Sequence, residues 1–214
     1  MTAPRPHGLF LTGTDTDIGK TVVAAWLVNG LGLDYWKPVQ SGLEGETDTE
    51  AVRRLTGLPD ERFHPSAFET RLPASPHLSA RLDGVQIRMD AFVLPDSPRP
   101  VLVEGAGGLL VPLNDAALMI DLIALLELPV VLVARSGLGT INHTLLSVEA
   151  LRSRNLALAG VVMNGPPHES NRHAIESYGN VPVIGQLPPI DHLSAGSLAA
   201  MTPPQIPGFE TTVS

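Results

Sequence analysis

The chain has 214 residues, 43% of them hydrophobic and 17% charged, a balance ordinary for one globular domain over residues 1–214. Its net charge of −8 disfavours nucleic acid as a partner, because phosphate backbones require a broad basic surface. The absence of cysteine excludes disulfides, thiolate metal sites and cysteine nucleophiles. No membrane-spanning apolar run or signal-peptide pattern is found, so we expect a cytoplasmic protein.

Apolar runs and turn residues predict alternating strands and helices. Strands are expected over 8–12, 34–39, 101–103, 130–133, 157–163 and 182–187. Helices are expected over 20–31, 47–55 (with a Thr47–Glu50 capping box), 75–82, 119–126, 141–154 and 169–178. Residues 57–76 are expected to be mostly irregular, and one short helix is expected near Leu198. Continuous apolar strands separated by helices indicate an α/β fold, with a mostly parallel central sheet and helices on both faces.

The stretch from Leu9 to Thr21 has the order strand, glycine turn, helix start that is typical of a phosphate-binding P-loop. Backbone N–H groups and the positive end of the helix dipole converge there on one anion. Lys20 would add a cation for the β- and γ-phosphates, and Thr21 a hydroxyl ligand for Mg²⁺. Five residues, not four, separate Gly13 from Gly19, which weakens the match by spacing alone. We therefore expect ATP binding on a P-loop NTPase-like three-layer sandwich. The other segments of the chain must decide which kind of P-loop protein this is.

Only two of the fourteen basic residues are lysines, Lys20 and Lys37. A compact ammonium differs from a planar guanidinium in reach and geometry. At the end of a predicted strand, Lys37 would point at the transferred phosphoryl group and offset charge in the transition state. The alternative for Lys37 is chance in a lysine-poor sequence. Ser41, in the loop that follows, either donates to a substrate oxygen or closes the turn.

Two carboxylates are candidates for binding the metal of the P-loop. Glu104 directly follows the apolar run 101–103, where nucleotide hydrolases place such a carboxylate, or else it caps the following turn. Asp48 lies in the first turn of its predicted helix, where its alternative role is to stabilise the helix dipole. Mg²⁺ prefers oxygen ligands of this kind, completed by phosphate and water.

A second glycine turn precedes the helix predicted over 141–154. The N–H groups of Gly139 to Asn142 could bind an anion such as a substrate carboxylate. Alternatively the turn is structural, capped by Thr140 or Asn142. His143 has no carboxylate or histidine partner nearby in sequence, so we expect it to be structural.

The polar and glycine-rich segments all follow predicted strands: 12–21, 37–42, 104–108, 135–143 and 164–167. Ligands of parallel sheets bind at the carboxyl ends of the strands, so these segments are expected to gather at one edge. Within the last of them, Asn164 could read an adenine edge, because its amide both donates and accepts hydrogen bonds.

Together these segments resemble the dethiobiotin synthetases, ATP- and Mg²⁺-dependent enzymes late in biotin synthesis. The resemblance rests on five segments in the family's order: GTDTDIGKT (13–21), KPVQSG (37–42), SPH (75–77), VEGAGG (103–108) and LGTINH (138–143). The five-residue spacer of the P-loop is this family's own variant. Two departures are the short segment between Gly42 and Asp48 and the short, Pro-rich end after Pro189.

The resemblance implies roles for individual residues. Lys20 and Lys37 would be catalytic, and Thr21, Asp48 and Glu104 would bind Mg²⁺. The ATP site would comprise Thr16, Asp17, Ile18, Gly19, Lys20, Thr21, Val22, Asp48, Glu104, Gly105, Ala106, Gly107, Asn164, Gly165, Leu187, Pro188 and Pro189. The diamine substrate would contact Ser41, and its carboxylate tail would be held across a homodimer interface by Gly139, Thr140 and Asn142.

The resemblance also implies the reaction. CO₂ and 7,8-diaminononanoate would form a carbamate, ATP would phosphorylate it, and the second amine would close the cyclic urea and expel phosphate. No covalent nucleophile is needed, which suits a site of cations, amides and metal ligands. The partners would be these small molecules and a second copy of the chain, with no nucleic acid and no membrane.

Three other functions of P-loop proteins fit the sequence less well. A P-loop switch ATPase, which acts through protein contacts, typically carries a lysine at the second P-loop position, where this chain has Thr14. An amidotransferase-type synthetase needs a cysteine nucleophile, which the chain lacks. A module that only binds nucleotide needs neither Lys37 nor Glu104. The sequence therefore favours the hypothesis that the chain is a synthetase.

Overall fold

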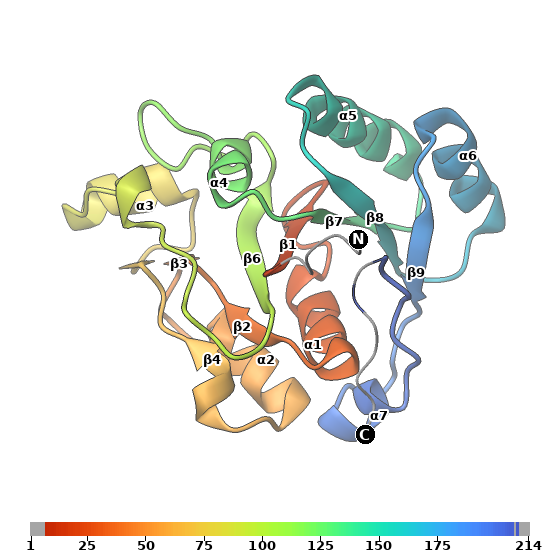
Figure 1. Cartoon of the computed structure of the whole chain (residues 1–214), viewed down its shortest axis with the longest axis horizontal. Coiled ribbons are helices and arrows are strands. Elements are labelled where there is room, and N and C mark those ends of the chain that lie inside the picture. Colours follow the sequence, from red (N-terminus) through yellow and green to blue (C-terminus); the bar gives the residue numbers. More distant parts are fainter. Residues whose placement is uncertain (1–6, 208, 210–214) are drawn as a thin grey trace, which may run out of the picture.

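A parallel sheet forms the centre of the computed structural model, which describes residues 7–207 and 209 (Figure 1). Within these residues, seven strands run in the order β4-β2-β6-β1-β7-β8-β9. They are β1 (Gly8–Gly13), β2 (Asp34–Trp36), β4 (Phe63–His64), β6 (Val101–Gly108), β7 (Val130–Arg135), β8 (Leu158–Asn164) and β9 (Val183–Leu187). The ends of the predicted 1–214 domain, residues 1–6, 208 and 210–214, lie outside the described residues.

Helices cover both faces of this sheet (Figure 1). They are α1 (Lys20–Leu31), α2 (Asp48–Thr56), α3 (Pro76–Asp83), α4 (Met119–Leu126), α5 (Thr140–Ser153), α6 (Glu169–Gly179) and α7 (Ala195–Ala199). One core holds apolar side chains of α1, α2 and α7, and two others hold those of α3, α4, α5 and α6. The predicted three-layer α/β sandwich with a parallel sheet is confirmed.

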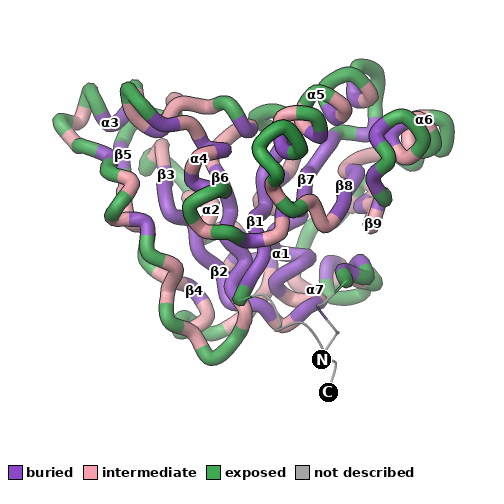
Figure 2. The backbone as a smooth tube through the Cα atoms, turned by 45° about the horizontal axis from the view of Figure 1, so that its top comes forward, coloured by how far each residue is buried: buried purple, intermediate pink, exposed green. Residues whose placement is uncertain are grey.

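Strand β1 shows why the strands are continuous apolar runs. Leu9 and Leu11 pack with the α1 side of the sheet, whereas Phe10 packs with the α4 side. All six residues of β1 are buried, because helices cover both of its faces. Figure 2 shows the same pattern, with buried strands inside and exposed segments along the loops and the outer helices.

The prediction of one strand over 34–39 is wrong. Strand β2 ends at Trp36, and β3 (Val39–Ser41) instead pairs with β5 (Phe68–Thr70) in a separate two-stranded sheet. Between them, Pro38 has no N–H for the ladder, and its carbonyl accepts from the N–H groups of Ala67 and Phe68 at 2.9 and 3.1 Å. The chain therefore leaves the main sheet just after Lys37.

The prediction that 57–76 is mostly irregular is confirmed, although short elements interrupt the irregular backbone. This region contains a 3₁₀ turn at Asp60–Arg62 and the strands β4 and β5. The strands are only two and three residues long and fit between the prolines, which explains why no periodic pattern marks them. A further 3₁₀ turn spans Met89–Ala91.

Several local predictions are confirmed. Helices α1 and α4 have the expected bounds, and α7 is the short helix expected near Leu198. The capping box before α2 is present: the N–H of Glu50 donates to Thr47 Oγ1 at 3.3 Å, and the N–H of Thr47 donates to Glu50 Oε2 at 2.8 Å. Strand β6 extends to Gly108, beyond the predicted end at residue 103. In the described part of the chain, no helix has the length and apolarity needed to cross a membrane.

Candidate active site

A cavity of about 840 Å³ opens beside the carboxyl ends of β1, β2 and β6. Three segments that were expected to converge line it: the P-loop, the KPVQSG segment and the end of β6. The lining residues are Thr16, Asp17, Gly19, Lys20, Thr21, Val22, Lys37, Ser41, Asp48, Pro73, Ala74, Ser75, Pro76, Glu104, Ala106, Gly107 and Val111. The structure thus brings together most of the predicted phosphate, metal and diamine residues. Ile18, which was predicted among them, is buried in the α1 core instead.

The P-loop reaches α1 through two residues in the left-handed region. Asp17 has φ 54°, which aspartate tolerates better than most residues, and Gly19 has φ 83°. A Cβ atom on Gly19 would lie 2.1 Å from Nδ2 of Asn164, so only glycine fits there. Lys20 folds back over the loop and donates from Nζ to the carbonyl of Asp15 at 3.0 Å. The five-residue spacer, residues 14–18, therefore forms a loop that Lys20 closes through its bond to Asp15.

Three oxygen-bearing side chains from α1, α2 and β6 meet on one wall of the cavity. The hydroxyl of Thr21 donates to Asp48 Oδ1 at 2.6 Å and lies 3.3 Å from Glu104 Oε1. In the described residues, no group of three His, Cys, Asp or Glu side chains could hold a metal ion. Two carboxylates and a hydroxyl do fit Mg²⁺, which takes oxygen ligands and usually completes its shell with phosphate and water.

Lys37 lies between these carboxylates. Its Nζ is 2.8 Å from Asp48 Oδ2, 3.1 Å from Glu104 Oε1 and 3.1 Å from the carbonyl of Gly105. The side chains of Lys37 and Glu104 are 4% and 1% exposed. A buried charge is costly unless it is paired, so the two carboxylates stabilise the buried ammonium of Lys37 at this position. Glu104 interacts with side chains of the site instead of capping the following turn.

Burial and neighbouring charges set the pKa values of these groups. Burial lowers the pKa of Lys20, and repulsion from Lys37 lowers it further. Burial by itself would lower the pKa of Lys37, but attraction to Glu104 and Asp48 outweighs burial and raises that pKa. Burial by itself would raise the pKa of Asp48, yet attraction to Lys37 outweighs burial and lowers that pKa. Burial raises the pKa of Glu104, while Lys37 opposes that rise and Asp48 adds to it. Lys37 is therefore a cation, and Asp48 an anion, at neutral pH.

Two residues that the sequence analysis missed support this group. Tyr35, which is fully buried, donates from its hydroxyl to Glu104 Oε2 at 2.9 Å. Burial and the nearby Glu104 raise the pKa of Tyr35 well above its ordinary value, so the phenol keeps its proton. Gln40 accepts from the N–H of Asp48 at 3.2 Å and so contacts the start of α2. Strand alternation could have revealed Tyr35, because it lies two residues before Lys37 and shares its face.

Comparisons with known proteins agree with this geometry. A family model described as an AAA domain matches residues 7–197. An ATP-dependent dethiobiotin synthetase BioD from Paramagnetospirillum magneticum is 51% identical over 198 residues, covering 92% of this chain and 96% of the relative. The chain belongs to the dethiobiotin synthetase family. Another BioD, from Brucella ovis, is 53% identical over 190 residues, covering 89% of this chain and 90% of that protein.

Two further comparisons bear on the extent of this family's domain and on its fold. The biotin biosynthesis bifunctional protein BioCD from Bordetella avium is 48% identical over 211 residues, which are 98% of this chain and 45% of that protein. The crystal structure of a ParA family ATPase from Chlorobium tepidum TLS has a TM-score of 0.56, with 10% identity and coverage of 92% and 97%. At that identity the likeness shows a shared fold only.

The segments that the dethiobiotin synthetase resemblance assigns to adenine lie together, but outside the main cavity. Asn164 donates from Nδ2 to the carbonyl of Ile18 in the P-loop at 2.8 Å, so one of its amide donors is engaged. The N–H of Gly165 donates to the carbonyl of Leu187 at 2.9 Å, which joins the ends of β8 and β9. Leu187 is buried, and it leads directly into Pro188 and Pro189.

The second glycine turn, Gly139 to Asn142, does not line the cavity that contains Lys37. Gly139, with φ 88°, is the N-cap of α5 and no side chain caps the helix, so the alternative of a Thr140 or Asn142 cap is wrong. Thr140 is buried, with its hydroxyl 3.4 Å from that of Thr144, whereas Asn142 is exposed. His143 is exposed and lines a different groove, described below, so it does not belong to the core.

Proposed function

We propose that the chain is a ligase that makes dethiobiotin from 7,8-diaminononanoate, CO₂ and ATP in biotin biosynthesis, with residues 1–214 as one synthetase domain. The observation that carries this function is the meeting of Lys37, Asp48 and Glu104 beside the P-loop, in a chain of this family. The small polar substrates and ATP are metabolites of the cytoplasm, which supports a cytoplasmic location.

The residues of the cavity divide the phosphoryl transfer among them. The backbone N–H groups of the P-loop and Lys20 would bind the β- and γ-phosphates, with Lys20 exchanging the carbonyl of Asp15 for phosphate oxygens. Lys37 would contribute positive charge where the phosphoryl group passes, held in place by its two carboxylates. Mg²⁺, when bound by Thr21, Asp48 and Glu104, would offset the charge of the phosphate oxygens.

The carbamate chemistry needs no covalent bond to the protein. One amine of the substrate adds to CO₂, and the carbamate oxygen then takes the γ-phosphoryl group and releases ADP. The second amine attacks the carbamate carbon and releases phosphate as the ring closes. Ser41, on the cavity wall, would orient the diamine. The apolar wall of Pro73, Ala74, Pro76 and Val111 would limit access of water to the phosphorylated carbamate.

The proposed adenine side of ATP contacts Asn164, Gly165, Leu187, Pro188 and Pro189. Asn164 lies beside Ile18 and Gly19, and Gly165 is hydrogen-bonded to Leu187, which supports this assignment, because ligands of parallel sheets bind at the carboxyl ends of the strands. Gly105, Ala106 and Gly107 would line the phosphate side.

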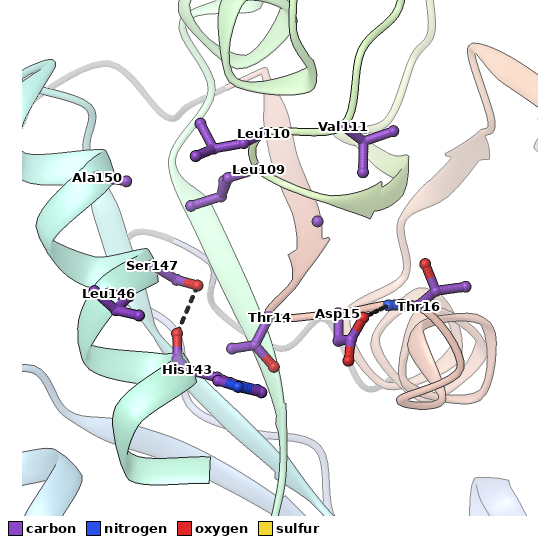
Figure 3. Close-up of a pocket in the computed structure, with 11 residues that line it drawn as sticks. Thr14, Asp15, Thr16, Leu109, Leu110, Val111, His143, Leu146, Ser147 and Ala150 are labelled. Atoms are coloured by element: carbon purple, nitrogen blue, oxygen red, sulfur yellow. Dashed lines mark hydrogen bonds between the residues drawn. The ribbon is translucent and has the colours of Figure 1, made fainter. Parts of the chain in front are cut away.

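A homodimer is proposed to complete the substrate site. A groove of about 400 Å³ runs between α5 and the segment after β6, with Thr14, Asp15 and Thr16 of the P-loop at one end (Figure 3). Leu110 and Leu146 line it and are 60% and 58% exposed, as expected of a surface that a partner covers. The turn of Gly139, Thr140 and Asn142 from a second copy would then bind the carboxylate tail of the substrate.

The deciding experiment measures product and ATP consumption by the purified protein. With Mg²⁺, bicarbonate and 7,8-diaminononanoate, we expect mass spectrometry to detect dethiobiotin, and ATP hydrolysis to depend strongly on the diamine. Equal rates of ATP hydrolysis with and without the diamine would overturn the synthetase function. Size-exclusion chromatography with light scattering tests the homodimer separately.

A further inference from the structure

A tyrosine hydroxyl lies in the interior of the molecule, directly behind the candidate metal site. Tyr35 is in β2, is 0% exposed and belongs to the core on the α1 side of the sheet. Its ring packs against that of Phe63 with a centroid distance of 6.1 Å. In this apolar setting its hydroxyl donates to a carboxylate oxygen of Glu104 at 2.9 Å.

The register of the sheet explains how the contact arises. Tyr35 lies opposite Leu102 in β6, and Glu104 is two residues further along that strand on the same face. The long side chain of Tyr35 spans this diagonal, because its hydroxyl lies 2.9 Å from Glu104 Oε2. Phenylalanine would fill the same space and remove only the donor.

The two oxygens of Glu104 have separate partners. Oε2 accepts from Tyr35, whereas Oε1 lies 3.1 Å from Lys37 Nζ and 3.3 Å from the Thr21 hydroxyl. Only Oε1 therefore points to the group of oxygens that includes Asp48. The bond from Tyr35 fixes the rotation of the carboxylate, since a turn of the group would leave a buried oxygen without a donor.

We propose that Tyr35 is a positioning residue for the divalent cation: by holding Oε2 of Glu104, it presents Oε1 to the cation beside Thr21 and Asp48. This inference rests on the proposed Mg²⁺ site of the synthetase. Tyr35 itself touches neither nucleotide nor metal. Residues that orient a metal ligand in this way commonly change metal affinity by roughly 10–100-fold when they are replaced.

A matched pair of variants tests the proposal. Tyr35→Phe removes the hydroxyl that binds Glu104. Ser97→Ala is the control, because Ser97 donates its hydroxyl to the buried carboxylate of Asp34, the first residue of the same strand, and not to Glu104. The affinity for a non-hydrolysable ATP analogue is measured by calorimetry in EDTA and again with Mn²⁺, and the Mn²⁺ complex is examined by electron paramagnetic resonance.

We expect Tyr35→Phe to reduce the Mn²⁺-dependent gain in nucleotide affinity roughly tenfold and to alter the Mn²⁺ spectrum, while affinity in EDTA, which reports a folded P-loop, stays unchanged. Ser97→Ala should retain both the gain and the spectrum. The inference is overturned if Tyr35→Phe keeps the wild-type gain and spectrum, or if both variants lose them equally. If the wild-type protein shows no gain with Mn²⁺, the proposed metal site fails, and this inference fails with it.

Discussion

The two ends of strand β2 each bear a buried carboxylate network, and the networks differ in what surrounds them. At the amino end, Asp34 is 1% exposed and accepts from Arg62 and Ser97. Near the carboxyl end, Glu104 is also 1% exposed and is paired with Lys37. Burial and ion pairing therefore do not distinguish the two networks.

The difference lies in access and in position on the sheet. Lys37 and Glu104 line the cavity of about 840 Å³, together with the P-loop. Arg62 instead donates both to Asp34 and to the carbonyl of Leu33, so it joins the edge of the sheet to the chain before β2. Ligands of parallel sheets bind at the carboxyl ends of the strands, so we expect the ion pair there to act on a ligand and the pair at the amino end to stabilise the fold. Mutations should separate these roles.

The largest effect is expected at the amino end, on stability. Arg62→Ala leaves Asp34 buried without its cation, and we expect the free energy of unfolding to fall by roughly 3–5 kcal/mol. Denaturant titration measures this loss, and turnover per folded molecule should stay at the wild-type level. A drop in turnover without a loss of stability would contradict the structural role of this network.

At the carboxyl end the expected effect is on catalysis. Lys37→Ala removes a charge that we assign to the transition state, so kcat should fall roughly 10²–10³-fold while the affinity for ATP is retained. Steady-state kinetics and calorimetry measure the two quantities. Lys37→Arg keeps the charge but not the compact ammonium, and should restore little activity. Near-normal turnover of Lys37→Ala would remove this lysine from the mechanism.

Some features of the fold and of the site follow from local signals in the sequence. The bounds of α1 follow from local signals, since Gly19 and Gly32 flank it in left-handed conformations. The start of α2 follows from the Thr47–Glu50 capping box. The family follows from short segments in a fixed order, which need no knowledge of the fold.

Other features depend on pairings between distant segments. The break after Trp36 arises because the chain beyond Pro38 pairs with β5 instead of the main sheet. Strand alternation places Tyr35 on the same face as Lys37, but its contact with Glu104 depends on the register between β2 and β6. The role of Asp48 in the helix dipole is visible locally, but its contact with Lys37 comes from the path of the chain between them.

A smaller effect is expected from the neutral hydrogen bond that joins β8 to the P-loop. Asn164→Ala removes the bond to the carbonyl of Ile18, a contribution of about 0.5–1.5 kcal/mol. We expect the Kd for ATP to rise several-fold, with little change in kcat at saturating ATP. Calorimetry and saturation kinetics test this, with Asn171→Ala as a control that loses an amide bond to the carbonyl of Ser136 instead. An unchanged Kd would separate Asn164 from nucleotide binding.

The smallest effect is expected from an ion pair that lies on the P-loop but outside the buried network. Arg135 Nη2 is 3.1 Å from Asp15 Oδ2, and the two side chains are 46% and 51% exposed. Water screens such a pair, so Arg135→Ala should lower the free energy of unfolding by only about 0.2–1 kcal/mol and reduce ATP affinity slightly at low salt. Denaturant titration and calorimetry at two salt concentrations measure both effects. A loss as large as that of Arg62→Ala would mean that position on the P-loop, and not burial, sets the strength of an ion pair in this molecule.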